Sequence, residues 1–418
     1  MAQIPHTTPA TSAETPVDAI RHYRTELESL RHDLHAHPEL AFEETRTSDL
    51  VAAKLASWGI EAHRGLAKTG VVGVIAGRRA NSSRAIGLRA DMDCLPVQET
   101  GAAAWRSQHA GRMHACGHDG HTSMLLGCAR YLAATRRFNG TAYLIFQPAE
   151  EAGGGGRVMV EQGLFERFPA NEIYALHNWP GLPAGQLAVR AGPVMAATDE
   201  FQLSIVGRGG HAAMPHLAAD PVVAAAHLIS ALQTIASRGV NPVDAVVVSV
   251  CSMQTSQLAA NNVIPDRVML GGTVRTFRPE TRALALRRVE EISRGIAAGL
   301  GARAELTIRP GYPATVNSPK QAAFAARVGA RLFGPENVIT DADPTMGGED
   351  FSYMLQARPG AYVWLGQGGA ASGCHLHNSS YDFNDAILPL GAGFLAALVE
   401  EAMPIRGPRP ARPRRHRA

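Results

Sequence analysis

Several side chains of this chain could bind metal ions or move protons, and they fall in four short segments. They are Cys116, His118, Glu150, Glu151, His177 and His377. Cys116 and His118 are separated by one glycine, and alternate residues of an extended backbone point to the same side, so both could reach one metal ion. The two glutamates and His177 each follow an apolar run. Because α/β sheets carry their sites at the carboxyl ends of strands, these segments are candidates for a common site.

The residue types in these segments suit a metal-dependent hydrolase. Thiolate, imidazole and carboxylate ligands together bind Zn²⁺ or another first-row divalent ion. Such an ion lowers the pKa of a bound water from ~16 to about 7 and makes it a nucleophile. One acid of the Glu150–Glu151 pair could bind metal, while the other takes the proton of the water and passes it to the leaving nitrogen.

Each pattern taken alone also has an ordinary structural explanation. A Cys-X-His pair is commonly a core cysteine beside a surface histidine, and adjacent glutamates are usually a solvated surface. The glycine run 153–156 could hold a phosphate, but no Lys-Ser/Thr follows it, which favours a turn. His114, His121 and His375 could equally be structural, support the ligands or be ligands themselves. The interpretation depends on all four segments together.

The elements that must position these residues alternate between helix and strand in the first part of the chain. Helices are expected near Val17–Leu34 and Glu44–Trp58, and another carries Met124, Leu125, Cys128, Tyr131 and Leu132 on one face. Apolar runs at residues 71–76, 85–90, 141–146 and 172–176 read as strands. This alternation predicts an α/β sheet with helices on its faces.

The pattern changes near Gly192. Residues 201–206 alternate as a half-buried strand, and a helix is expected over Asp220–Arg238, where Asp-Pro is a start signal. Strands at 245–251 and 267–276, a helix at 280–300 and a strand at 304–308 follow. This βαββαβ order predicts a ferredoxin-like α+β arrangement.

At 418 residues the chain is too long for one ordinary core, and the helix and strand alternation resumes from about Tyr312. We therefore expect a two-part α/β catalytic domain over residues 17–191 and 312–403, with a mixed sheet flanked by helices. A ferredoxin-like domain over 192–311 is inserted into it. Disordered segments are expected at 1–16 and 404–418.

Composition indicates a globular, cytoplasmic protein: 45% of residues are hydrophobic and 18% are charged. No stretch approaches the ~18 apolar residues of a membrane span, and the first sixteen residues lack the apolar core of a secretory signal. The five cysteines, an odd number scattered over a long chain, argue for reduced thiols.

The net charge of +3 depends on the tail. Residues 404–418 carry six arginines and no acid, so the remainder is +3 − 6 = −3. Such a tail could bind polyanions loosely, but the body has no basic stripe with interleaved aromatics, so specific nucleic-acid binding is not expected.

The joint pattern resembles the M20 metallopeptidases, specifically the N-acyl-amino-acid amidohydrolases, hippurate hydrolases and auxin-conjugate hydrolases. The resemblance runs from about Arg31 to Pro389. It rests on specific stretches that begin at Arg31, Leu88, His114, Gln147, Leu176, Gly207, Asn262, Gly272 and Met346.

Matched residue by residue, the resemblance implies metal ligation by Cys116, His118, Glu151, His177 and His377. Cys116 stands where related M20 members have a metal-bridging carboxylate, so it could bridge two ions. Glu150 matches the general base, and Asp91 and Asp93 could orient ligands. Two divalent ions per chain, Zn, Mn, Co or Ni, are implied.

In the inserted domain, His211, Asn262 and Arg275 match residues with which the family holds substrate. His211 would polarise the scissile carbonyl, and the planar fork of Arg275 would bind a carboxylate. One departure is Ser379, which follows His377-Asn378 where the family usually has proline and could loosen that loop.

The expected reaction is hydrolysis of an N-acyl amino acid to a carboxylic acid and a free amino acid. A metallo-carboxypeptidase or dipeptidase acting on short peptides is the alternative with the same chemistry, and a non-catalytic binding protein is a more distant one. The partners expected are this small substrate and, through the inserted domain, a second copy of the chain in a homodimer or homotetramer. No membrane partner is expected.

Overall fold

The computed structural model describes residues 14–256 and 260–405. Most of the segments expected to be disordered, residues 1–13 and 406–418, lie outside this range. The described chain forms two compact units. Unit 1 comprises residues up to Val189 together with Lys320–Asp341 and the part from Arg358 onward, and unit 2 comprises Arg190–Pro319 with Ala342–Ala357. The division into domains at residues 192 and 312 stays a prediction.

Unit 1 contains an eight-stranded mixed sheet in the order β1-β2-β4-β3-β5-β16-β6-β15. Its strands are β1 (Glu61–Leu66), β2 (Gly70–Ala76), β3 (Ala85–Asp91), β4 (Thr141–Gln147), β5 (Glu172–Trp179), β6 (Leu187–Ala188), β15 (Val338–Ile339) and β16 (Gly360–Gly366). The four central strands β4, β3, β5 and β16 are parallel. Strands β3 and β16 are buried along their whole length, as expected for central strands covered on both faces.

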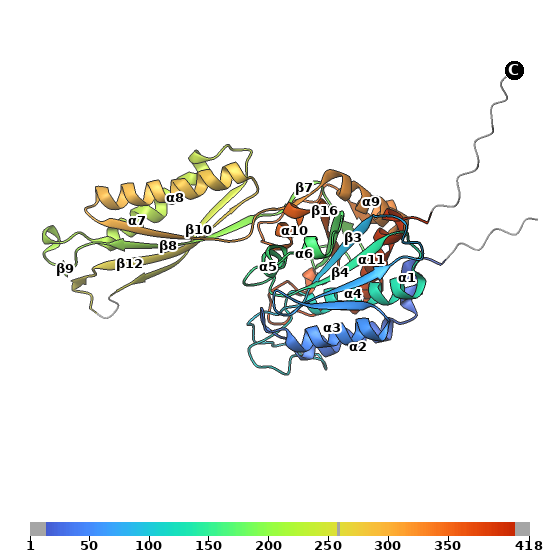
Figure 1. Ribbon diagram of the computed structural model, residues 1–418. Helices are drawn as coiled ribbons and strands as arrows, with labels where there is room; N and C mark the ends of the chain where they lie inside the picture. Colours follow the sequence, from blue (N-terminus) through green and yellow to red (C-terminus); the bar gives the residue numbers. More distant parts are fainter. Residues whose placement is uncertain (1–13, 257–259, 406–418) are drawn as a thin grey trace, which may run out of the picture. The chain divides into compact units, whose positions relative to one another are not determined.

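The helices of unit 1 flank this sheet (Figure 1). They are α1 (Pro16–Arg21), α2 (Arg24–Ala36), α3 (Thr45–Ser57), α4 (His118–Thr135), α5 (Gly155–Glu161), α6 (Leu164–Arg167), α9 (Pro319–Phe333) and α11 (Leu388–Ala402). Helices α4 and α11 pack together and against β3 and β5. The predicted α/β fold with a mixed sheet flanked by helices is confirmed.

The single helix expected over Val17–Leu34 is instead two helices, α1 and α2. The chain breaks at His22 and Tyr23, and the two pieces pack on different partners. Val17 of α1 closely approaches Gly393 of α11, while Leu27 of α2 contacts Gly127 of α4. One straight helix could not follow both partners, so tertiary packing overrides the continuous helical pattern.

Unit 2 contains a four-stranded antiparallel sheet in the order β10-β12-β8-β13, with helices α7 and α8 on one face (Figure 1). The elements are β8 (Ala197–Val206), α7 (Pro221–Leu232), β10 (Val246–Thr255), β12 (Arg267–Thr276), α8 (Pro279–Gly299) and β13 (Arg303–Pro310). The order and connectivity are those of the ferredoxin-like arrangement. Shorter elements are β7 (Gly192–Met195), β9 (Gly210–His211), β11 (Val263–Ile264), β14 (Thr315–Asn317) and α10 (Phe351–Ala357).

The core of unit 2 explains its strand pattern. Phe201, Leu203 and Ile205 are buried beneath the helices, and the residues between them on β8 are more exposed. Helix α7 begins as expected, because the side chain of Asp220 accepts hydrogen bonds from the N–H groups of Val222 and Val223. Helix α7 ends at Leu232, six residues before the expected end at Arg238. A π-helical turn over Ile235–Gly239 occupies most of the rest of the expected helix.

Candidate metal centre

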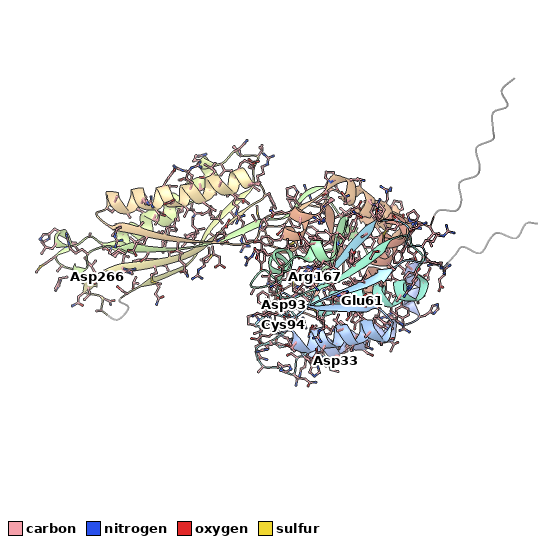
Figure 2. All side chains as sticks on the ribbon, viewed as in Figure 1. Asp33, Glu61, Asp93, Cys94, Arg167 and Asp266 are labelled. Atoms are coloured by element: carbon pink, nitrogen blue, oxygen red, sulfur yellow. The ribbon has the colours of Figure 1, made fainter. Side chains whose placement is uncertain are left out.

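The candidate ligands of unit 1 follow the carboxyl ends of adjacent parallel strands. Strand β3 ends at Asp91, β4 ends at Gln147 immediately before the Glu150 segment, and β5 contains His177. Because these strands run in the same direction, their ends meet at one edge of the sheet. Asp93, labelled in Figure 2, lies just beyond the end of β3.

Two groups of potential ligand atoms share Cys116. The ligand atoms of Cys116, His118 and His177 lie within 4.8 Å of one another, and so do those of Cys116, Glu151 and His377. Cys116 Sγ is 3.4 Å from His177 Nε2, and Glu151 Oε1 is 3.3 Å from His377 Nε2. The fold therefore brings the five expected ligands together around one thiol.

Gly117 allows the close approach between Cys116 and His118. It has φ +98°, and a Cβ atom at this position would lie 2.3 Å from Asn178 Oδ1. A side chain there would be strained and would also clash, so glycine is required. Helix α4 starts at His118, directly after this turn.

Hydrogen bonds orient two of the histidines. His177 donates from Nδ1 to the carbonyl oxygen of Asn178 at 2.6 Å, and His118 donates from Nδ1 to the carbonyl oxygen of Asp93 at 2.9 Å. In both rings this leaves Nε2 facing the cluster, where it is available as a metal ligand.

The electrostatics of the cluster depend on its acids. Burial lowers the pKa of His118, but the carboxylates of Asp91, Asp93 and Glu151 outweigh burial and raise the pKa to about 10. The pKa of His177 is held well below its ordinary value, mainly by burial and secondly by the nearby positive charge of His121. Burial, together with Glu151 and Glu150, raises the pKa of the Cys116 thiol. Without a cation the thiol stays protonated, so its use as a ligand requires a metal that displaces the proton.

The donor set fits a divalent metal. Among the described residues, the buried atoms His118 Nε2 and Glu151 Oε1 have no hydrogen-bond partner, although such atoms are normally paired. Both belong to residues of the cluster, and thiolate, imidazole and carboxylate are the ligands that suit Zn²⁺ and related ions.

Asp91 lies beside the cluster in a network of charged residues. Its carboxylate accepts hydrogen bonds from Arg89 Nη1 and from His121 Nδ1, each at 2.6 Å. His121 Nε2 is 2.6 Å from Asn178 Oδ1. His121 thus lies between Asp91 and Asn178, although Asp91, His118 and His121 also form a compact group of possible ligands.

His377 is supplied by a loop with an unusual backbone. It has φ +64°, and its N–H donates to the carbonyl oxygen of Ala115 at 2.7 Å, next to Cys116. Ser379, the departure from the family pattern, accepts a hydrogen bond from the Thr100 N–H through its carbonyl oxygen at 2.8 Å. The hydroxyl groups of Thr100 and Ser379 are 3.1 Å apart, so a second hydrogen bond connects the His377 loop to the Thr100 segment.

Unit 2 holds the three expected substrate-binding residues at two separate places. His211 is exposed on β9, and the N–H of Ala212 donates to the carbonyl oxygen of Asn262 at 2.9 Å, so these two residues are neighbours. His211 follows the end of β8 at Val206, and Asn262 precedes β12, whose first residue Arg267 pairs with Val206. Arg275 pairs with Thr198 at the beginning of β8. With a rise of ~3.3 Å per residue, the two places are roughly 25 Å apart.

Other candidates have different surroundings. His114 is buried, neither of its ring nitrogens has a hydrogen-bond partner among the described residues, and burial lowers its pKa to about 4. His375 is exposed. The glycine run leads into the short helix α5 through Gly153 and Gly154, both with positive φ.

The sequence pattern assigns no functional role to Glu44. Its side chain is fully buried and accepts a hydrogen bond from the backbone N–H of Ala149, beside Glu150. The only local signal is an acid at the start of a helix, which would ordinarily be read as a helix cap. The long-range contact is visible only in the folded chain.

The sheet and the ligand cluster at its carboxyl edge define a metal-dependent hydrolase. The sequence pattern of peptidase family M20/M25/M40 matches residues 87–401. The chain is 41% identical over 373 residues to a hippurate hydrolase of Campylobacter jejuni, covering 89% of this chain and 95% of that protein. It is 38% identical to an N-acetylcysteine deacetylase of Bacillus subtilis, covering 90% of this chain and 96% of that protein.

Comparison with a solved structure supports the same family. A dinuclear metal-binding peptidase of the M20 family from Bacillus subtilis superimposes with a TM-score of 0.79 at 34% identity, covering 92% of this chain and 99% of that one. The chain belongs to the peptidase family M20/M25/M40, and it is an amidohydrolase of that family. Among the described residues, no helix is both long and apolar enough to cross a membrane.

Proposed function

We propose that this enzyme hydrolyses the amide bond of N-acyl amino acids, such as N-acetyl or N-benzoyl derivatives, to a carboxylic acid and a free amino acid. The observation that carries the proposal is the position of Glu150. It is 6% exposed, and its carboxylate lies within 4.8 Å of the ligand atoms of His118 and Glu151. An acid at the rim of a ligand cluster is suited to move protons at a reacting centre. The hippurate hydrolase and the deacetylase among its relatives act on substrates of this class by their names.

The proposed ligands are Cys116, His118, Glu151, His177 and His377, with Cys116 shared between two divalent ions. Bound ions would polarise the amide carbonyl and lower the pKa of the attacking water. Asp93 would hold His118, and Asp91 would hold His121, in their orientations.

Glu150 performs the proton transfers in this proposal. Its carboxylate removes one proton from water as the oxygen–carbon bond forms. It then delivers this proton to the amide nitrogen as the carbon–nitrogen bond breaks. The acid and the amine leave, and Glu150 is ionised again for the next cycle.

Substrate binding is assigned to His211, Asn262 and Arg275, with His211 polarising the carbonyl and Arg275 binding the carboxylate of the amino acid. One short substrate could not touch both ends of β8, because they are roughly 25 Å apart. We therefore propose that His211 and Asn262 act on the site of a second copy of the chain, in a dimer. A cytoplasmic location remains part of this proposal.

A substrate panel tests the proposal. The metal-reconstituted protein is assayed for release of free amino acid from N-acetyl, N-benzoyl and indole-acyl amino acids, and from dipeptides. We expect an N-acyl amino acid to have the highest kcat/KM. Higher kcat/KM for dipeptides would establish the peptidase alternative. Turnover of none of them, in protein with full metal content, would contradict hydrolysis of either class.

A further inference from the structure

Strained backbone gathers around one buried carboxylate of unit 1. Among the described residues, six that are not glycine have positive φ, a conformation that L-residues rarely adopt. Four of the six lie in the three segments that the side chain of Glu44 joins: Phe42, Ala67, Lys68 and Ala149. Such strain persists only where the surroundings hold it in place, and it clusters at functional sites.

Glu44 makes one hydrogen bond to each of these segments. Its Oε1 accepts from the N–H of Ala149 at 2.9 Å and from the N–H of Phe42 at 3.1 Å. Its Oε2 accepts from Thr69 Oγ1 at 2.7 Å, and Thr69 follows Lys68. The side chain is 0% exposed, so these contacts are not shared with solvent.

Glu44 does not act as an ordinary helix cap. It occupies the position before α3, but its side chain makes no hydrogen bond to the N-terminus of that helix. The carboxylate instead contacts the segment that follows β4, 105 residues further along the chain. A role confined to the stability of α3 would not explain this orientation.

The segment held by Glu44 is the turn that presents Glu150. Ala149 has φ +56°, in the left-handed region, and a turn over residues 150–153 follows it directly. The carbonyl oxygen of Ala149 accepts from the N–H of Gly155 at 2.9 Å, which closes the other side of the turn. A Cβ atom at Gly155 would lie 1.8 Å from the carbonyl oxygen of Pro148, so only glycine fits where the chain passes this close to the turn.

The neighbouring segment packs against the same turn. A Cβ atom on Gly153 would lie 2.5 Å from Phe42 Cε2. The ring of Phe42 thus lies close to Gly153, two residues after Glu151, and the N–H of Phe42 donates to Glu44. The Phe42 segment therefore contacts the turn directly through its ring and indirectly through the side chain of Glu44.

We propose that Glu44 is a positioning residue of the hydrolytic site: its carboxylate holds Ala149 in the left-handed conformation that directs Glu150 to the ligand cluster. The inference rests on the proposed role of Glu150. Because a displacement of ~1 Å of a catalytic group can reduce the rate by 10²-fold, the loss of this contact should affect catalysis more than substrate binding.

The test compares Glu44→Ala with the double variant Glu44→Ala/Ala149→Gly, using the best substrate of the panel and metal-saturated protein. Glu44→Ala should lower kcat at least tenfold, change KM less than about threefold and retain its metal. Glycine adopts positive φ without strain, so the double variant should recover a substantial part of kcat. Glu44→Gln keeps an acceptor oxygen for the two N–H groups and should stay within about threefold of wild type.

Glu172→Ala is the matched control. Glu172 is also a buried acid of unit 1 and accepts from Tyr174 and Arg84, but it lies at the opposite end of β5 from His177. The Glu172→Ala substitution should lower the melting temperature of the protein without lowering kcat. A kcat of Glu44→Ala as high as that of Glu172→Ala, or the absence of any recovery in the double variant, would overturn the proposal.

Two further measurements keep the test independent of folding and of the substrate. If Glu44→Ala does not fold, Glu44→Asp replaces it, because its carboxylate is one methylene too short to reach all three donors. Wild-type kcat in this variant would contradict the inference. Crystal structures of wild type and variant report φ of residue 149 and the position of Glu150. They test the positioning role even if the panel reveals no turnover and the proposed function itself fails.

Discussion

The carboxylate of Asp93 accepts a hydrogen bond from the backbone N–H of Glu151 at 2.9 Å. The other oxygen of Asp93 is 3.2 Å from His118 Nδ1, and its carbonyl oxygen is 2.9 Å from the same nitrogen. One side chain at the end of β3 therefore links two proposed ligands that come from different segments.

This link predicts that Asp93→Ala weakens metal binding although Asp93 is not a proposed ligand. Loss of such an outer contact typically lowers metal affinity 10–100-fold, and we expect a loss of this size in competition with a chelator. Glu61→Ala is the control, because the Glu61 side chain is exposed on β1 (Figure 2) and forms its ion pair with His63, which is not a proposed ligand. Equal affinities of the two variants would argue against the link.

Cys116→Ser should reduce the metal content of the purified protein. A hydroxyl does not ionise to a ligand as a thiol does, and Cys116 belongs to both ligand groups. Metal analysis should find up to two ions per wild-type chain and fewer in the variant, with loss of activity. Cys128→Ser, in the buried core of α4, should keep wild-type metal content. Full activity of demonstrably metal-free wild type would contradict the metal requirement.

Glu150→Gln and Glu151→Gln should fail in different ways. The first keeps the shape of the side chain but cannot carry a proton, so kcat should fall by ~10²–10⁴ while the metal is retained. The second removes a proposed ligand and should lose metal. Metal analysis and steady-state kinetics on both variants distinguish the roles, and the reverse outcome would show that the two residues exchange them.

Mixing inactive Glu150→Gln with inactive His211→Ala should restore part of the activity if subunits share sites. Some mixed dimers would then contain one site with both residues intact. Each variant alone, taken through the same exchange procedure, is the control. Exchange that mass measurement confirms, without recovery of activity, would show that His211 acts within its own chain.

The stability of the protein should depend on His35. Burial lowers the pKa of His35, but Asp119 at 2.8 Å and Glu99 at 3.4 Å outweigh burial and raise the pKa to about 9. The unfolded value is about 6.5. The stabilisation is therefore fully present below pH 6.5 and is lost as the pH rises through about 9.

His35→Asn removes this titration. We expect its free energy of unfolding, measured by urea denaturation at saturating metal, to fall below that of wild type by up to about 3 kcal/mol at pH 6. The difference should shrink toward pH 10. A difference that does not change with pH would exclude a charged His35 in the folded protein.

Patterns in the sequence correctly predicted those elements whose structure is determined by residues close to them in the chain. The period of the apolar residues predicted β8, and Asp220-Pro221 predicted the start of α7. The break at His22 and Tyr23 was missed because two distant helices, α4 and α11, determine it. The contact of Glu44 with Ala149 was missed for the same reason. No spacing rule in one sequence connects residues 105 positions apart.

The length of the antiparallel strands in unit 2 has a consequence for how the enzyme would behave on dilution. If His211 and Asn262 serve a second copy of the chain, as proposed, an isolated chain lacks part of the machinery. Turnover per chain would then be constant at high protein concentration and decline once dilution separates the copies. Because the two ends of β8 are too far apart to serve one site, specific activity would report the fraction of chains that are associated with a second copy.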